Sequence, residues 1–334
     1  MIASIEFRSF RVLGKTSLPL GRFNLILGPN GSGKSTAVKA LLALRGLVED
    51  RSRAGGGANP PRPGEACEAH LALSFSDPFS GYTASVDCVQ GERWRALEFF
   101  RDGERVEAVP EALLAGLSGV RSLALEAAAL SRPCPPGSGW AMGADGAGFP
   151  ALLGRLSEED PMRWAQLVEA FSQLMPEFAA LTTSRPDHGD WSFTATTADG
   201  LELAAGDLSQ GTLVALALHA LAFLPERPSL LCLEELERGI HPRLLREVRD
   251  SLYRLCYPED SGDEAEPVQI VATTHSPYLL DLFADHPEEV VLTVKEGGSA
   301  SFKRLIDLPD LAELLETGNL GDLWYSGVIG GVPY

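Results

Sequence analysis

The chain has 334 residues, of which 45% are hydrophobic, and a formal net charge of −18 at pH 7. This composition can fill one large core or two modest ones, and it excludes an intrinsically disordered chain. The acidic balance disfavours broad attraction to nucleic acid, so a DNA partner would require a local basic patch.

No stretch reaches the roughly 20 apolar residues that a membrane-spanning helix needs. Glu6 and Arg8 lie within an alternating pattern at the N-terminus, which is unlike a signal peptide. We therefore expect a cytoplasmic protein without a membrane partner. The five cysteines are odd in number and include no Cys-x-x-Cys pair, so the sequence predicts neither a disulfide framework nor a zinc site.

The beginning of the chain predicts a nucleotide-binding lobe. Alternation over residues 2–10, a short stretch at 17–20 and an apolar run at 23–27 indicate three strands, and residues 37–48 have a helical pattern. Between the third strand and the helix stands Gly-Pro-Asn-Gly-Ser-Gly-Lys-Ser-Thr. A segment with these glycines and a final Lys-Ser-Thr, joining a strand to a helix, is typical of a phosphate-binding loop.

The phosphate-binding loop predicts a nucleoside triphosphate and Mg²⁺ as ligands. Its glycines let successive backbone N–H groups turn toward the phosphates, Lys34 reaches the β and γ phosphates, and the Ser35 hydroxyl joins the Mg²⁺ shell. The predicted binding residues are Gly28, Pro29, Asn30, Gly31, Ser32, Gly33, Lys34, Ser35 and Thr36.

The composition changes after about residue 51 and predicts an insertion. Residues 54–64 are rich in glycine and proline and indicate a loop, and the stretches 70–75, 82–89 and 93–100 predict an antiparallel meander. A helical region follows a second Pro and Gly cluster at 132–148, with Asp160 as the cap before Pro161. Asp199-Gly200 between two β-favouring runs predicts a hairpin.

The nucleotide-binding pattern resumes from about residue 207. Helices are predicted at 210–223 and 242–256, and strands at 230–233, 269–272, 290–294 and 301–305. We therefore expect a discontinuous ATPase domain made of residues 1–50 and 200–334, interrupted by an inserted meander and helical subdomain at residues 51–199.

Three motifs follow the phosphate-binding loop, and each also has a purely structural interpretation. Glu234 and Glu235 end an apolar strand, where one carboxylate can bind Mg²⁺ through water and the next can polarise a water, but two acids can also be a solvated strand end. His275 ends another apolar strand, where it can bind a γ-phosphate or be structural. Ser209, Gln210 and Gly211 begin a helix, whose N–H groups can bind an anion or simply be capped.

In this order, the motifs resemble the ABC-type ATPase domains of the SMC, RecF and OLD group, and most closely the stand-alone bacterial "AAA family ATPase" proteins related to the OLD family. The resemblance rests on residues 23–36, on 208–213, on LLCLEELERGIHP at 230–242 and on IVATTHSPYLLDLF at 270–283. It covers most of the chain. It implies an α/β fold, that of an ABC-type P-loop ATPase with a mixed sheet and flanking helices.

The resemblance also implies a role for each motif. Glu234 takes the Mg²⁺-associated Walker B position, Glu235 that of the general base, and His275 that of the switch histidine, with Lys34 as the catalytic cation. Ser209, Gln210 and Gly211 match the signature element, which in this group meets the γ-phosphate of a second subunit, so ATP is expected at the interface of a homodimer. The segment with Glu237, Gly239 and His241 is expected beside that interface.

Two departures argue against a transporter subunit: the signature reads Leu-Ser-Gln-Gly-Thr instead of Leu-Ser-Gly-Gly-Gln, and Walker B ends in Glu-Glu instead of Asp-Glu. Both variants occur among OLD-like proteins. The Q-loop glutamine is not assigned, because Gln90, Gln166 and Gln173 all lie in the insertion without a telling context.

The sequence leaves three functions open. Full-length OLD proteins carry a Toprim nuclease domain, but only about 50 residues follow Phe283 here, so the first hypothesis is an ATPase that controls a separately encoded effector, such as a Toprim-type nuclease in phage defence or genome maintenance. The alternative is a RecF-like, ATP-gated DNA clamp, although charge alone does not indicate DNA. An ABC transporter subunit is the least favoured. For Trp324 and Tyr325 near the C-terminus, packing onto the core and docking of a partner are both open interpretations.

Overall fold

The computed structural model describes residues 1–53, 69–89, 93–94, 97–137, 139–296 and 298–330. The predicted loop at 54–64, Cys67 and Gln90 lie outside these ranges. The described residues form two compact units. The first unit comprises Met1–Ser122, Ser229–Leu236 and Gln269–Tyr334, and the second comprises Leu123–Pro228 and Glu237–Val268.

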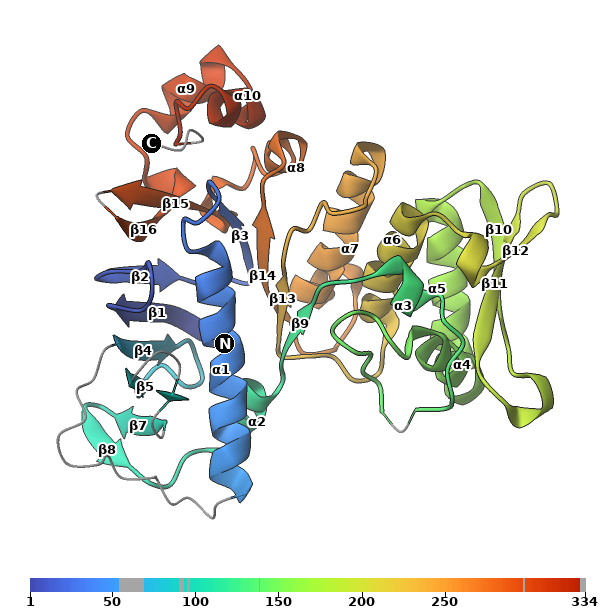
Figure 1. Cartoon of the computed structure of the whole chain (residues 1–334), viewed down its shortest axis with the longest axis horizontal. Coiled ribbons are helices and arrows are strands. Elements are labelled where there is room, and N and C mark those ends of the chain that lie inside the picture. The colour runs from blue at the N-terminus through green and yellow to red at the C-terminus, as the bar shows by residue number, and fades with distance from the viewer. Residues whose placement is uncertain (54–68, 90–92, 95–96, 138, 297, 331–334) are drawn as a thin grey trace. The chain divides into compact units, whose positions relative to one another are not determined.

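The first unit contains an antiparallel sheet in the order β2-β1-β4-β5-β7-β8, with β6 paired to β5 (Figure 1). Alternating burial along β4 shows that one face of the sheet meets the core. The strands are β1 (Ile2–Arg8), β2 (Thr16–Pro19), β4 (Ala69–Phe75), β5 (Tyr82–Val89), β6 (Arg93–Trp94), β7 (Glu98–Arg101) and β8 (Glu104–Val106).

A second sheet of the first unit has the order β16-β15-β3-β14-β13-β9. Its central strands β3, β14 and β13 are fully buried and are mutually parallel, as their continuous apolar runs require. The strands are β3 (Phe23–Leu27), β9 (Val120–Leu123), β13 (Leu230–Leu233), β14 (Gln269–Thr274), β15 (Val290–Glu296) and β16 (Ser299–Arg304).

Helix α1 (Lys34–Arg53) lies in the core that the two sheets share (Figure 1). Its buried residues Leu41 and Leu44 belong to one apolar cluster with Phe7 of β1, Leu71 of β4 and Val271 of β14. The helix is longer at both ends than the predicted 37–48. The other helices of this unit are α2 (Glu111–Ser118), α8 (Pro277–Asp281), α9 (Leu311–Thr317) and α10 (Leu320–Tyr325).

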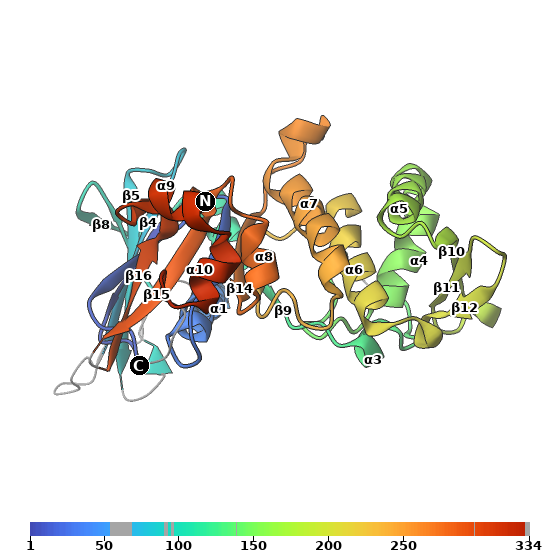
Figure 2. The same ribbon diagram turned by 90° about the horizontal axis from the view of Figure 1, so that it is seen from above.

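The second unit is built around α6 (Gln210–Ala220), whose residues from Thr212 to Ala220 are all buried. A helix that is apolar on every side requires neighbours all round, and α3, α5 and α7 contact it. Figure 2 shows α5 beside the small antiparallel sheet β10-β11-β12, with α6 and α7 farther from this sheet. The elements are α3 (Ala127–Leu130), α4 (Phe149–Glu159), α5 (Pro161–Leu174), α7 (Leu245–Cys256), β10 (Phe178–Ser184), β11 (Ser192–Thr197) and β12 (Glu202–Ala204).

A helix cap and a hairpin of the second unit lie where the sequence predicts them. The Asp160 carboxylate accepts a hydrogen bond from the Arg163 N–H at 3.1 Å and so caps α5. The hairpin at Asp199-Gly200 joins β11 to β12. The segment predicted as one helix at 242–256 begins with a 3₁₀ turn, Pro242–Leu244, before α7.

The compact units divide the chain differently from the boundaries expected at residues 51 and 200. The predicted meander is present as β4 to β8, but β4 pairs with β1, so these strands share a sheet and a core with the N-terminus. No helix in the described ranges is long and apolar enough to cross a membrane.

Candidate functional site

The phosphate-binding loop, Glu234 and His275 leave the second sheet at the same edge. Strand β3 ends at Leu27, which pairs with Thr274 at the end of β14, and Leu233 at the end of β13 pairs with Ala272. Because the three strands are parallel and adjacent, the residues that follow them emerge together at their carboxyl ends. This edge is where α/β sheets place their ligands.

Two glycines of the loop have backbone conformations that other residues rarely adopt. Gly31 has a φ of 73° and Gly33 a φ of 101°. A β-carbon on Gly33 would also come within 2.7 Å of the Leu13 side chain, which belongs to the β1–β2 turn. Asn30, Gly31 and Ser35 are exposed, so the outer face of the loop is accessible.

Thr293 of strand β15, which is 1% exposed, contacts the phosphate-binding loop. Its hydroxyl is hydrogen-bonded to the Ser32 hydroxyl and also contacts the Leu27 carbonyl at 3.2 Å. A β-carbon on Gly28 would collide with this threonine. The loop is therefore fixed by a strand that comes more than 200 residues later in the chain.

Lys34 points its ammonium group at the inside of the loop. Its Nζ donates to the carbonyls of Gly28 and Pro29, at 2.7 and 3.0 Å, and the residue is 7% exposed. A cation held at this loop can neutralise phosphate charge.

Ser35 and Glu234 meet directly, since the Ser35 hydroxyl donates to Glu234 Oε2 at 2.6 Å. The hydroxyl and the carboxylate supply oxygen ligands of the kind that Mg²⁺ prefers, so this pair of residues fits the predicted metal ion. Cys232, two residues earlier, is not a ligand candidate because burial, with a smaller contribution from Glu234, raises the pKa of its thiol to about 12.

Glu235 is exposed and has a φ of 53°, in the left-handed region. For a residue with a β-carbon this conformation costs about 1 kcal/mol or more, and such outliers cluster at functional sites. Its N–H donates to Thr273 Oγ1 of β14 at 2.9 Å.

His275 is half-buried in the turn between β14 and α8. The turn is closed by the Ser276 N–H, which donates to Thr274 Oγ1 at 2.9 Å. His275 thus follows Thr274 directly at the edge where the phosphate-binding loop begins.

Ser209, Gln210 and Gly211 lie in the second unit, at the start of α6. The Ser209 hydroxyl accepts from the Thr212 N–H at 3.1 Å and caps the helix, and Ser209 and Gln210 are exposed. Gly211 packs on the 237–241 segment, because a β-carbon on Gly211 would come 3.0 Å from the Gly239 carbonyl. The signature residues and the 237–241 segment therefore form one local surface.

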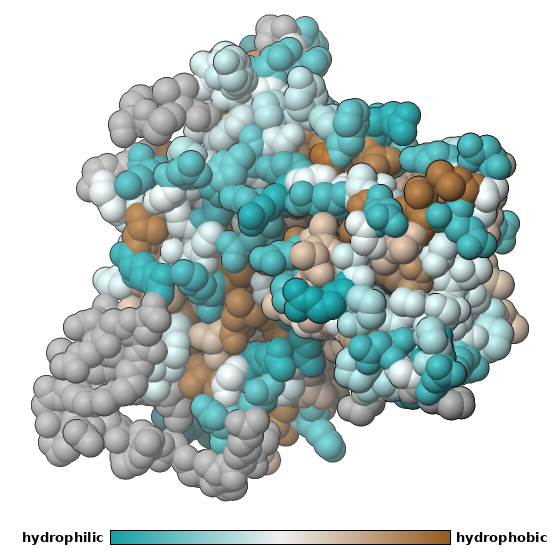
Figure 3. Space-filling model, turned by 45° about the vertical axis from the view of Figure 1, so that its right-hand side comes forward, coloured by the Kyte–Doolittle hydropathy of each residue, from teal (hydrophilic) through white to brown (hydrophobic). Residues whose placement is uncertain are grey.

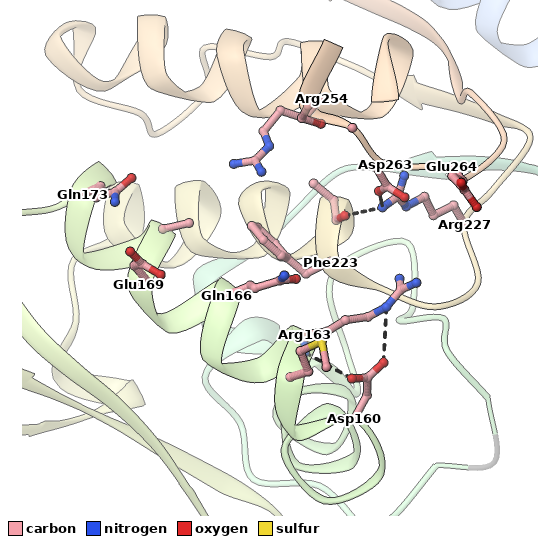
Figure 4. A pocket seen from close by; sticks show the side chains of 15 residues that line it. Asp160, Arg163, Gln166, Glu169, Gln173, Phe223, Arg227, Arg254, Asp263 and Glu264 are labelled. Carbon is pink, nitrogen blue, oxygen red and sulfur yellow. Dashed lines mark hydrogen bonds and ion pairs between the residues drawn. The ribbon is translucent and has the colours of Figure 1, made fainter. Parts of the chain in front are cut away.

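The second unit also contains a polar pocket of about 750 Å³ between α5, the end of α7 and residues 261–264 (Figure 4). Two of its three arginines form ion pairs, Arg163 with Asp160 at 3.2 Å and Arg227 with Asp263 at 2.5 Å. The lining includes two of the three glutamines considered for the Q-loop, Gln166 and Gln173.

The two aromatic residues of α10 differ in burial. Trp324 is 6% exposed, while Tyr325 is 84% exposed. Helix α10 contacts α8, and the Gly321 N–H donates to Asp281 Oδ1 at 2.7 Å (Figures 1 and 2). Packing is thus the role of Trp324, and of these two residues only Tyr325 is accessible to a partner.

On the face drawn in Figure 3, hydrophilic residues predominate and apolar residues form separate areas.

Thr273 and Thr293 are the site residues that sequence reasoning missed. Thr273 is one of two adjacent threonines at the end of β14, and Thr293 is the single threonine of β15. No spacing or motif distinguishes either of them from a strand residue that only packs. The one available signal was a polar residue within an otherwise apolar run.

Residues 157–281 match a family model described as "AAA domain, putative AbiEii toxin, Type IV TA system". A sequence search of curated proteins finds no match.

Solved structures of SMC head domains are similar to the chain. An SMC head bound to the C-terminal winged-helix domain of ScpA is 16% identical, with 90% of this chain and 96% of that chain covered and a TM-score of 0.59. The head from Pyrococcus furiosus, with an extended coiled coil and bound to the C-terminal domain of ScpA, is 14% identical, with coverage of 95% and 98% and a TM-score of 0.55. The Thermotoga maritima head is 12% identical, with coverage of 91% and 98% and a TM-score of 0.50.

The chain therefore has the fold of the SMC head domains, an α/β fold with a mixed sheet and flanking helices, and the predicted fold class is confirmed.

Proposed function

We propose that the protein binds Mg-ATP at the phosphate-binding loop and hydrolyses it. The contact between Ser35 and Glu234, at 2.6 Å, is the observation that carries this proposal. It joins two residues 199 positions apart, one at the start of α1 and one at the end of β13, in the pairing that a Walker A and Walker B site requires.

Each residue of the site has a part in this reaction. The N–H groups of the loop and Lys34 bind the phosphates, and Ser35 with Glu234 would hold Mg²⁺, which neutralises charge on the phosphates when bound. Glu235 accepts a proton from the attacking water, and His275 donates a hydrogen bond to the γ-phosphate.

Two copies of the chain assemble across ATP in this proposal. The exposed start of α6, with Ser209, Gln210 and Gly211, contacts the γ-phosphate bound by the other copy. Anions bind well at such a helix N-terminus, where N–H groups and the helix dipole point at the ligand.

The cycle of ATP binding and hydrolysis controls a separately encoded effector protein, such as a Toprim-type nuclease in phage defence or genome maintenance. Two similar SMC heads were solved with a domain of ScpA bound, which supports a partner protein for this fold. A DNA clamp is the alternative outcome of the experiment below.

The proposal is tested by measuring ATP binding and phosphate release. Lys34→Ala should abolish binding, because the loop loses its cation, while Glu235→Gln should retain ATP and lower kcat by about a hundredfold or more, because an amide is not a base. Lys39→Ala, at an exposed position of α1, is the control and should behave as wild type. Unchanged ATP affinity in Lys34→Ala would reject the site.

The same assay separates the two functions. Hydrolysis stimulated by the protein encoded beside this one, and not by duplex DNA, supports the effector proposal. Stimulation by DNA alone, with loss of DNA binding in Lys34→Ala, would instead establish the clamp.

A further inference from the structure

We propose that Thr273 is a positioning residue that aims the carboxylate of Glu235; the inference rests on the proposed function, which makes Glu235 the general base. Thr273 is the penultimate residue of β14 and is 2% exposed. Strand β14 separates β13, which carries the glutamates, from β3, which leads into the phosphate-binding loop.

Two hydrogen bonds join Thr273 to the segment that follows β13. The Glu235 N–H donates to the Thr273 hydroxyl oxygen at 2.9 Å, and the Leu236 N–H donates to the Thr273 carbonyl at 3.0 Å. One residue of β14 therefore fixes two successive backbone amides immediately after Glu234.

The backbone of Glu235 needs such an anchor. Its φ of 53° lies in the left-handed region, which a residue with a β-carbon leaves unless its surroundings hold it there. No described residue is hydrogen-bonded to the Glu235 carboxylate, so the direction of this side chain depends on the backbone. Release of the N–H lets φ change, and a change in φ turns the Cα–Cβ bond away from its present direction.

The hydroxyl of Thr273, and not its bulk, supplies the anchor. Valine has nearly the same shape and packs equally well in a buried strand, but it cannot accept a hydrogen bond. Serine retains the acceptor and loses a methyl group. The pair Thr273→Val and Thr273→Ser thus separates positioning from packing at a single site, and Thr273→Ala is a second variant without the hydroxyl.

We expect Thr273→Val and Thr273→Ala to lower kcat for ATP hydrolysis at least about tenfold, since a misplacement of about 1 Å can cost a hundredfold. KM and ATP affinity should stay within about twofold of wild type, because the phosphate-binding loop is untouched. Thr273→Ser should retain a kcat close to that of the wild type. Valine and alanine variants with wild-type kcat would overturn the proposal.

A double variant distinguishes positioning from general damage. In the Glu235→Gln background the side chain is no longer a base, so Thr273→Val should lower the residual rate little further. An equal loss in both backgrounds would mean that Thr273 acts independently of Glu235, and the proposal would fail.

Amide hydrogen exchange tests the anchor without any activity. The Glu235 amide should exchange faster in Thr273→Val than in wild type or Thr273→Ser. If wild type does not hydrolyse ATP, the proposed function is rejected, and the exchange rates still decide whether Thr273 holds Glu235. Equal exchange in all three proteins would overturn the inference.

Discussion

Acidification should destabilise the second unit through His219. This residue lies in α6 and is 5% exposed. Its Nδ1 is 2.7 Å from the Ser251 hydroxyl, which donates to the Glu247 carbonyl at 2.7 Å, so Nδ1 carries the proton and Nε2 is the basic nitrogen. Nε2 is buried and has no hydrogen-bond partner among the residues that the structure describes. Burial, and to a smaller extent the charge of Arg254, lower the pKa of His219 to about 4.

The sign and size of the effect follow from this pKa. Above pH 6.5 the ring is neutral in the folded and unfolded states alike. As the pH falls from 6.5 to about 4, the unfolded chain takes up a proton that the folded unit does not, so the free energy of unfolding decreases. The loss is about 2 kcal/mol at pH 5 and about 3 kcal/mol at pH 4.

The assay is an NMR titration of histidine rings combined with thermal denaturation at pH 7.5 and pH 5. His219→Asn assigns the resonance, and it should reduce the destabilisation by acid because asparagine does not titrate. Arg254→Gln should raise the pKa of His219 only part of the way toward 6.5, because burial is the larger cause. A His219 ring that titrates near 6.5 in the folded protein would refute the reasoning.

Two further predictions concern the dimer and the C-terminal region. Ser209→Arg places a bulky cation at the exposed start of α6, so it should preserve ATP binding but lower hydrolysis at least about tenfold. Light scattering in the Glu235→Gln background should then show no ATP-dependent dimer. A dimer that survives Ser209→Arg contradicts the assembly proposed across ATP. Trp324→Ala should lower stability by about 3 kcal/mol, as for other buried aromatic residues, whereas Tyr325→Ala should change it by less than about 0.5 kcal/mol; denaturation measures both, and equal losses would show that the burial of Trp324 does not matter.

The sequence predicted those parts of the fold that depend on local chemistry. Apolar runs at 230–233 and 269–272 are strands β13 and β14, and Asp160 caps α5. These features follow from residues that are neighbours in the chain, so a single sequence reveals them. The roles assigned to the site residues stay predictions.

What the sequence did not predict depends on contacts between distant segments. The first unit includes residues 69–106 because β4 pairs with β1, and no local sequence pattern predicts this pairing. Thr273 holds Glu235 across 38 residues of chain, and Thr293 supports Ser32 across 261. Tertiary packing likewise forms α10 although glycines surround it.

The arrangement of the second sheet also determines when the nucleotide site can form during synthesis. Strand β3 has β14 on one side and β15 on the other, and the Asn24 amide reaches the Ile270 carbonyl across 246 residues. A ribosome-bound chain that has exposed only its first half contains the complete loop sequence but neither flanking strand. Pairings of such high contact order form late and slowly. Under the proposed function, a nascent chain could bind ATP only after β15 has left the ribosome, and until then the apolar β3 needs protection from aggregation.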